Sequence, residues 1–121
     1  MREIKFRGIS VRDGEWYYGD LVQLMGEVIP ETVGRFTGLK DVNGTEIYEG
    51  DILYDDFYSK YYLVKYKDGG FSALPYFDTE TSGIDLFEVC DDVRVVSNTY
   101  YVTLMKTTKK EGEENEWEEN E

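Results

Sequence analysis

The side chains of this chain that could do chemistry are almost all carboxylates. Its 121 residues include 26 Asp and Glu, no histidine and one cysteine. Acidic pairs that could hydrolyse a glycoside or hold a hard cation occur at Asp55-Asp56, Asp91-Asp92 and Asp78-x-Glu80. Adjacent residues of a strand point to opposite faces, so each pair needs a turn to bring its carboxylates together. Because histidine, the usual general base and metal ligand, is missing, we expect no catalysis, no metal and no cofactor.

A second segment whose side chains could bind a ligand is the run Lys60 to Lys67, which interleaves cations with aromatic rings. Its candidate contact residues are Lys60, Tyr62, Lys65, Tyr66 and Lys67. Cations that follow a phosphate backbone and rings that stack on bases are typical of small barrels that bind single strands. The alternative is that the tyrosines of one parity are core and that the lysines keep the outer face in water. Nucleic-acid binding is therefore one hypothesis for this strand.

The net charge of −13 is concentrated in the tail. Residues 111–121 hold seven acidic and no basic side chains, which leaves 19 acidic against 13 basic residues in 1–110. A like-charge block repels itself, so we predict a disordered tail over 109–121. The tail either only solubilises the chain or uses Trp117 as an anchor in a basic pocket of a partner. A third hypothesis is that the acidic surface imitates DNA and inhibits a host factor.

Alternating apolar residues predict short strands rather than helices in the remaining chain. The segments with this pattern are 16–24, 52–54, 61–67, 71–74, 87–90 and 93–104. A bulge is expected near Gly19, because Asp20 interrupts the apolar face of the first segment. Cys90 should pack on a strand, and helical turns are possible at 55–58 and 78–83. The fold class is therefore all-β.

Gly-containing turns should connect these strands. Asn43-Gly44 predicts a type I′ hairpin turn, because both central residues of that turn need a positive φ. A calcium loop at Asp41 is the weaker interpretation, since an EF-hand needs its glycine at position 6 and not at position 4. Gly50-Asp51 should open a strand, and Gly69-Gly70 should form another hairpin turn.

Three further stretches of the sequence are Lys5-Phe6-Arg7-Gly8, Gly14-Glu15-Trp16 and Glu31 to Leu53. Together they resemble the YopX family of small proteins from phages and prophages of Gram-positive bacteria. This resemblance implies one domain over 1–108, with an N-terminal hairpin region at 1–48 and an SH3-like barrel at 49–104. The family often ends in an Asn-Pro-Glu-Leu tail, which is absent here. It has no agreed biochemical activity, so the resemblance implies no catalytic residue.

The function we expect is that of a non-enzymatic accessory protein that contacts host or phage proteins or itself. An aromatic content of 16% leaves tyrosines for the surface, where they favour interfaces. A single cysteine excludes an internal disulfide, and the first residues lack an apolar signal segment. We therefore expect a cytoplasmic protein of the bacterial host cell, without a membrane partner.

Overall fold

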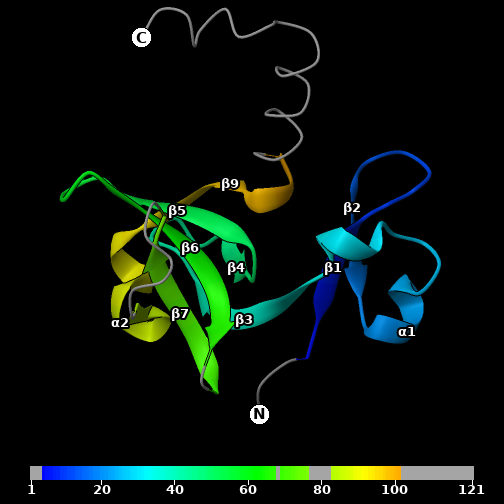
Figure 1. Cartoon of the computed structure of the whole chain (residues 1–121), viewed down its shortest axis with the longest axis horizontal. Helices are drawn as coiled ribbons and strands as arrows, with labels where there is room; N and C mark the ends of the chain where they lie inside the picture. Colours follow the sequence, from blue (N-terminus) through cyan, green and yellow to red (C-terminus); the bar gives the residue numbers. More distant parts are fainter. Residues whose placement is uncertain (1–3, 68, 77–82, 102–121) are drawn as a thin grey trace, which may run out of the picture.

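The computed structural model describes residues 4–67, 69–76 and 83–101. They form antiparallel sheets that lie side by side in Figure 1. The first sheet has the order β2-β1-β3-β4, with bounds β1 Phe6–Ile9, β2 Trp16–Gly19, β3 Gly34–Lys40 and β4 Glu46–Tyr48. The second has the order β8-β7-β6-β5-β9, with bounds β5 Asp51–Asp55, β6 Lys60–Lys67, β7 Gly70–Pro75, β8 Ile84–Asp85 and β9 Arg94–Asn98. Of the helical turn expected at 78–83, only residue 83 is described. Trp117 and its tail lie entirely outside the described residues.

The five-stranded sheet is open rather than closed. Its two edges are β8 and β9, and no ladder among the described residues joins them. One segment expected as a barrel strand, 87–90, is helical instead and covers a face of the sheet. The antiparallel β-rich fold is therefore confirmed, whereas the SH3-like barrel is not.

Short helical segments replace strand at several places where the sequence predicted a strand. The strand expected over 16–24 ends at Gly19, and α1 Leu21–Leu24 follows. Asp20 caps α1, since its Oδ1 accepts from the N–H of Gln23 at 2.8 Å while its own N–H donates to Gln23 Oε1 at 2.9 Å. In this capping box the side-chain oxygen of each residue accepts the backbone N–H of the other. Both N–H groups are therefore satisfied, which favours a helix start over a bulge.

The second replacement surrounds the cysteine. Asp85 Oδ1 accepts from the N–H of Phe87 at 3.0 Å and so begins α2 Leu86–Val89, which runs into the 3₁₀ turn η2 Cys90–Asp92. Another 3₁₀ turn, η1, spans Pro30–Thr32. At the C-terminal end, β9 stops at Asn98 and a helical turn follows at 99–101. The strand expected over 93–104 is therefore shorter than predicted, as far as the described residues extend.

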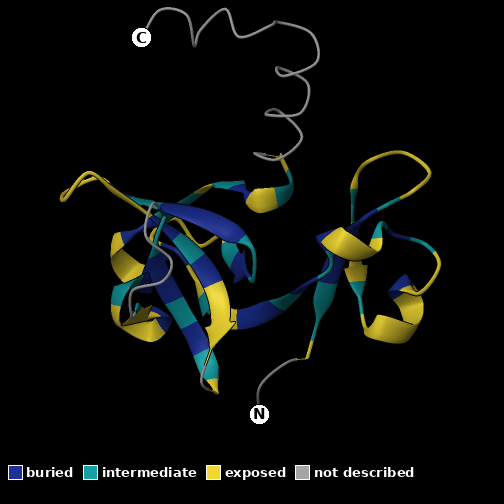
Figure 2. Ribbon diagram, in the orientation of Figure 1, coloured by how far each residue is buried: buried dark blue, intermediate teal, exposed yellow. Residues whose placement is uncertain are grey.

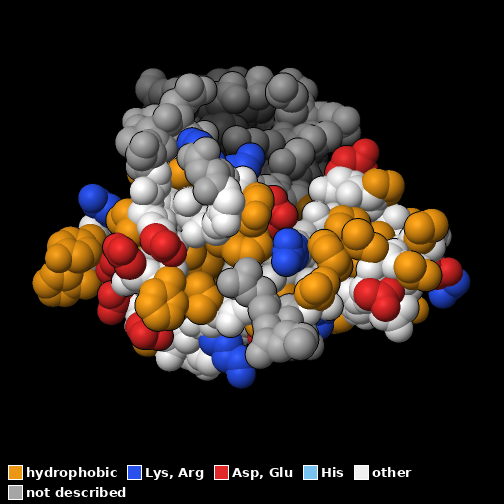
Figure 3. Space-filling model, turned by 90° about the horizontal axis from the view of Figure 1, so that it is seen from below, with side chains coloured by type: hydrophobic (Ala, Val, Ile, Leu, Met, Phe, Trp, Pro, Cys, Tyr) orange, Lys and Arg blue, Asp and Glu red, His pale blue; other side chains and the backbone are white. Residues whose placement is uncertain are grey.

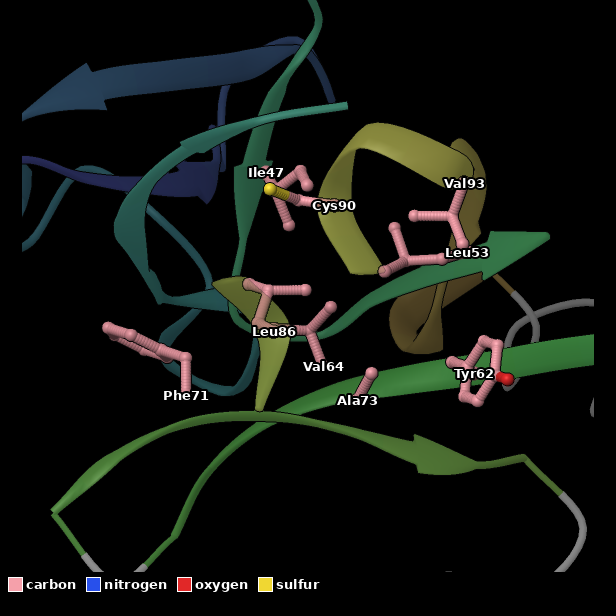
Figure 4. Packing of buried hydrophobic residues seen from close by; sticks show 9 residues of the cluster. All are labelled: Ile47, Leu53, Tyr62, Val64, Phe71, Ala73, Leu86, Cys90 and Val93. Atoms are coloured by element: carbon pink, nitrogen blue, oxygen red, sulfur yellow. The ribbon is translucent and has the colours of Figure 1, made fainter. Parts of the chain in front are cut away.

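The main apolar core lies between the five-stranded sheet, β4 and the α2–η2 segment. Figure 2 shows the buried stripe along these strands, and Figure 4 shows side chains of the cluster pointing toward one another. Leu86 and Val93 are almost fully buried, and so is Cys90 with 5% exposed. Burial raises the pKa of the Cys90 thiol. The cluster consists of Ile47, Leu53, Tyr62, Val64, Phe71, Ala73, Leu86, Cys90 and Val93.

The hairpin between β3 and β4 exists as predicted, but its turn is of another type. Lys40 pairs with Glu46, and the N–H of Gly44 donates to the carbonyl of Asp41 at 3.0 Å. Gly44 has φ 84°, whereas Asn43 is not among the described residues with positive φ. One left-handed residue after a turn indicates a type I turn with a bulge rather than type I′. The turn is favoured because Asp41 Oδ1 accepts the N–H groups of Asn43 and Thr45, each at 2.8 Å.

Candidate interaction surface

The lysines and tyrosines of β6 do not form one surface, because the strand alternates between two environments. Tyr62 is 6% exposed and belongs to the core, which corrects its assignment to a contact surface. Tyr66 is half exposed, and its ring packs edge-on against Phe71 with centroids 5.1 Å apart. Burial also raises the pKa of the Tyr62 hydroxyl. The aromatic part of the predicted site is thus used largely for packing.

The cations of β6 divide between the two faces of the sheet. Lys60 shares the parity of Tyr62, whereas Lys65 and Lys67 point to the opposite face. All three are exposed. Lys65 lines a small cavity of about 190 Å³ together with Arg7 and Trp16 of the other sheet. The structure therefore does not bring the three lysines into one basic stripe.

The glycines and acids predicted to shape turns have structural partners. Gly50 has φ 95° and Gly69 has φ 86°, both in the left-handed region, and Gly70 opens β7. Asp51 is 1% exposed, and its carboxylate accepts from Arg7 Nη2 and from the N–H of Tyr48. Burial raises the pKa of the Asp51 carboxyl, and the charge of Arg7 opposes this rise. Asp51 thus joins β1 to β5 and is unavailable to a ligand.

Arg7 is held in an aromatic environment beside this ion pair. Its guanidinium lies 3.9 Å from the ring centroid of Trp16 and 4.7 Å from that of Tyr48. Nε of Arg7 is buried and has no hydrogen-bond partner. Burial raises the pKa of the Tyr48 hydroxyl, which donates to Glu46 Oε1 at 3.1 Å. The cluster fixes the first sheet against the second.

The acidic pairs do not form a catalytic arrangement in the described residues. Asp55 is buried, and its Oδ1 accepts from the N–H groups of Phe57 and Tyr58 in the turn after β5. Its neighbour Asp56 is exposed and pairs with Arg94 at 2.9 Å, which lowers the pKa of Asp56. Within residues 4–67, 69–76 and 83–101, no group of three or more acidic or cysteine side chains could hold a metal ion. The pair at Asp78 and Glu80 lies outside these ranges.

A groove beside α2 has the features of a docking surface. Its volume is about 770 Å³, and it lies between β3, the start of β7 and the first residues of α2. Buried Phe36, Phe71 and Leu86 contribute to its lining. Phe87 also lines it, although 72% of this residue is exposed. Water therefore reaches a large aromatic side chain at the edge of a groove whose lining is partly apolar and partly polar.

Carboxylates are close to this groove along the chain. The segment 85–92 contains four exposed acids and no lysine or arginine: Asp85, Glu88, Asp91 and Asp92. None of the four has an ion pair with another described residue. Figure 3 shows acidic side chains around surface hydrophobic groups on the side of the molecule that carries α2. We call Phe87, the groove and these four acids the α2 surface.

Of the other exposed apolar side chains, Tyr61 and Ile84 line a second cavity of about 340 Å³, and several more lie outside both cavities. Phe57, 84% exposed, and Tyr58, 65% exposed, form the tip of the β5–β6 turn and stack edge-on at 4.7 Å. Val22 and Met25 are exposed at α1. Sequence reasoning placed residue 87 on a strand and did not identify it as an exposed residue at a groove. The signal that could have revealed it is Asp85, a residue type that caps helices, directly before an apolar pair.

The fold and this surface define a small β-rich protein of two antiparallel sheets with a groove beside an exposed phenylalanine and a run of exposed acids. The model of the YopX protein family matches residues 24–103, and the chain belongs to this family. No match was found among curated proteins. Among the described residues, no helix is long and apolar enough to cross a membrane.

Proposed function

We propose that this chain is a non-enzymatic, phage-type accessory protein that works as a protein-interaction module through its α2 surface. Membership of the YopX family supports the phage-type part of this proposal. The observation that carries the interaction part is Phe87, which is 72% exposed while its neighbour Leu86 is fully buried. Fully burying such a side chain is worth about 1.5–3 kcal/mol, which is available to a partner.

The shape of the surface supports the same function. A groove of about 770 Å³ falls in the range of roughly 300–1,000 Å³ that is usual for binding pockets. Its floor is made of core residues, so a ligand meets a surface that is already formed. Preorganisation of this kind lowers the entropic cost of binding. A peptide side chain inserted beside Phe87 is the simplest occupant.

Nucleic-acid binding through β6 has less support. Tyr62 is in the core, and the lysines divide between opposite faces of the sheet. Phosphate contacts supply most non-specific affinity, and they require several cations on one face. The tyrosine-rich surface and the free edges of β2 and β9 leave self-association as an alternative to a foreign partner.

The experiment that tests the proposal is an affinity purification of the tagged protein from induced or infected host cells, with and without nuclease. Phe87→Ala is compared with Phe57→Ala, because both side chains are highly exposed and neither change should affect folding. We expect the wild type to capture a host or phage protein even after nuclease treatment. Phe87→Ala should lose this partner, and Phe57→Ala should still capture it. Equal capture by the wild type and both variants, or loss of all partners on nuclease treatment, would refute an α2 docking site.

A further inference from the structure

We infer that the partner segment that docks on the α2 surface is basic, with an apolar or aromatic anchor flanked by lysine or arginine. This inference rests on the proposed function and adds the chemistry of the partner. It is carried by the exposed Phe87 at the groove and by the run of exposed carboxylates on the same short segment, none of which has an ion pair with another described residue.

The charge of the α2 surface is the first argument. The four acids of 85–92 are exposed, and the segment contains no lysine or arginine. Three charged residues line the groove: Lys40, Glu46 and Asp85. Glu46 is already paired with Lys5 at 3.0 Å. Asp85 is one of the four acids, and Lys40 is the one lysine or arginine in the lining. The surface is therefore net negative even when Lys40 is included. A complementary partner brings positive charge, which accelerates association and suppresses acidic competitors.

The aromatic ring is the second argument. An arginine or lysine over the face of an aromatic ring is attracted by the ring quadrupole. Phe87 offers an exposed ring, and Glu88 follows it directly in the chain. A partner cation can thus meet the ring face, while an apolar neighbour enters the groove. Neutral apolar segments would use only the second of these contacts.

The same charges argue against a second copy of this chain as the occupant. Two α2 surfaces facing each other across a twofold axis would bring eight carboxylates together, four from each copy. Like charges placed across an interface are costly. The β2 edge lies on the other sheet, so self-association there would not compete with a basic segment at α2.

The test uses the full-length protein and three fluorescein-labelled peptides with one shared Leu-Trp anchor. The anchor is flanked by two Lys-Arg pairs in the basic peptide, by Gln-Ser pairs in the neutral one and by Glu-Asp pairs in the acidic one. Fluorescence anisotropy is recorded at low and at physiological ionic strength. We expect the basic peptide to bind at least tenfold more tightly than the neutral one, with an affinity that falls as salt rises.

Variants locate the binding. Phe87→Ala should weaken the basic peptide about tenfold, which corresponds to about 1.4 kcal/mol, and Phe57→Ala should leave it unchanged. The double change Glu88→Lys and Asp91→Lys should reduce both affinity and salt dependence. Circular dichroism confirms that each variant is folded, as expected for exposed positions.

The outcomes separate this inference from the proposed function. Equal binding of basic and neutral peptides, both lost with Phe87→Ala, would overturn the basic partner and keep the docking site. No binding of the basic peptide would overturn the inference, while the host purification still decides the docking site. Assembly detected by light scattering and abolished by Phe87→Ala would show that a second copy is the occupant, which also overturns it.

Discussion

Removal of the Asp41 carboxylate should destabilise the protein more than any surface change. The side chain is 6% exposed, and it accepts three backbone N–H groups at 2.8 Å. Asn43 and Thr45 donate to Oδ1 within the hairpin turn, while Val95 of β9 donates to Oδ2 from the other sheet. The carboxylate therefore holds the turn in shape and joins the two sheets.

The expected loss follows from these contacts. A hydrogen bond to a charged group contributes about 1.5–3 kcal/mol. Allowing for relaxation of the exposed turn, Asp41→Ala should lower the free energy of unfolding by about 3–5 kcal/mol. Asp41→Asn keeps the oxygen that serves the turn but places an N–H₂ group opposite the N–H of Val95, so its loss should be about 1.5–3 kcal/mol. Because small domains are stable by only about 5–15 kcal/mol, either variant is easy to distinguish.

Urea unfolding followed by tryptophan fluorescence measures these differences. The control is Asp13→Asn, because Asp13 also accepts a backbone N–H, from Glu15 at 3.0 Å, but is exposed. Its effect should stay within about 0.5 kcal/mol. If Asp41→Asn and Asp41→Ala both matched this control, the carboxylate would not join the sheets as described. Calcium should not rescue either variant, since the Asp41 oxygens serve backbone groups.

Further predictions concern charge, thiol reactivity, backbone geometry and the basic strand. Lys5 lowers the pKa of Glu46, so the stability that this carboxylate adds is present above its unfolded pKa of about 4.5 and is lost as the pH falls through the lower folded value. The free energies of unfolding of wild type and Glu46→Gln, measured in urea, should therefore converge in acid. At neutral pH they should differ by less than about 1 kcal/mol, because solvent screens this pair. Burial raises the pKa of the Cys90 thiol, so a disulfide reagent at pH 8 should label it quickly only after unfolding, and fast labelling of the native protein would contradict its burial. Gly50 has φ 95°, and Gly50→Ala should cost about 1–2 kcal/mol in thermal unfolding, whereas an unchanged midpoint would show that the turn relaxes. Lys65→Glu should not change binding of single-stranded DNA at low salt, because the β6 cations are divided; a steep loss would make nucleic-acid binding, so far the alternative, the leading hypothesis.

Elements bounded by glycine turns could be predicted from the sequence, and short helices could not. The β6–β7 hairpin and the start of β5 follow from Gly69 and Gly50, whose positive φ values mark the turns. α1 and α2 have four residues each, which is too short for the i, i+3, i+4, i+7 pattern that identifies a helix. Their only local signals are the capping side chains of Asp20 and Asp85.

The candidate site was harder to predict because exposure depends on tertiary packing. Tyr62 and Tyr66 have the same parity and the same residue type, yet one is in the core and the other is half exposed. Tyr62 belongs to the buried cluster, whereas Tyr66 is the next-to-last residue of β6. Likewise, Leu86 and Phe87 are equally apolar neighbours, and the sequence does not show which of them points inward; in the fold it is Leu86.

The stretch that carries the family resemblance, Glu31 to Leu53, is largely explained by the demands of the fold. Asp41 and Asp51 are buried acids that satisfy backbone and arginine donors. Gly44 and Gly50 supply left-handed turn residues, and Ile47 and Tyr48 are core. Residues used in this way cannot also recognise a partner, so recognition must rest on side chains that the fold leaves exposed. Apart from one wall of the groove, the α2 surface lies outside this stretch; its Phe87, Glu88, Asp91 and Asp92 are exposed, whereas Asp85 also caps α2. The proposed docking segment is therefore largely separate from the residues that build the turns and the core.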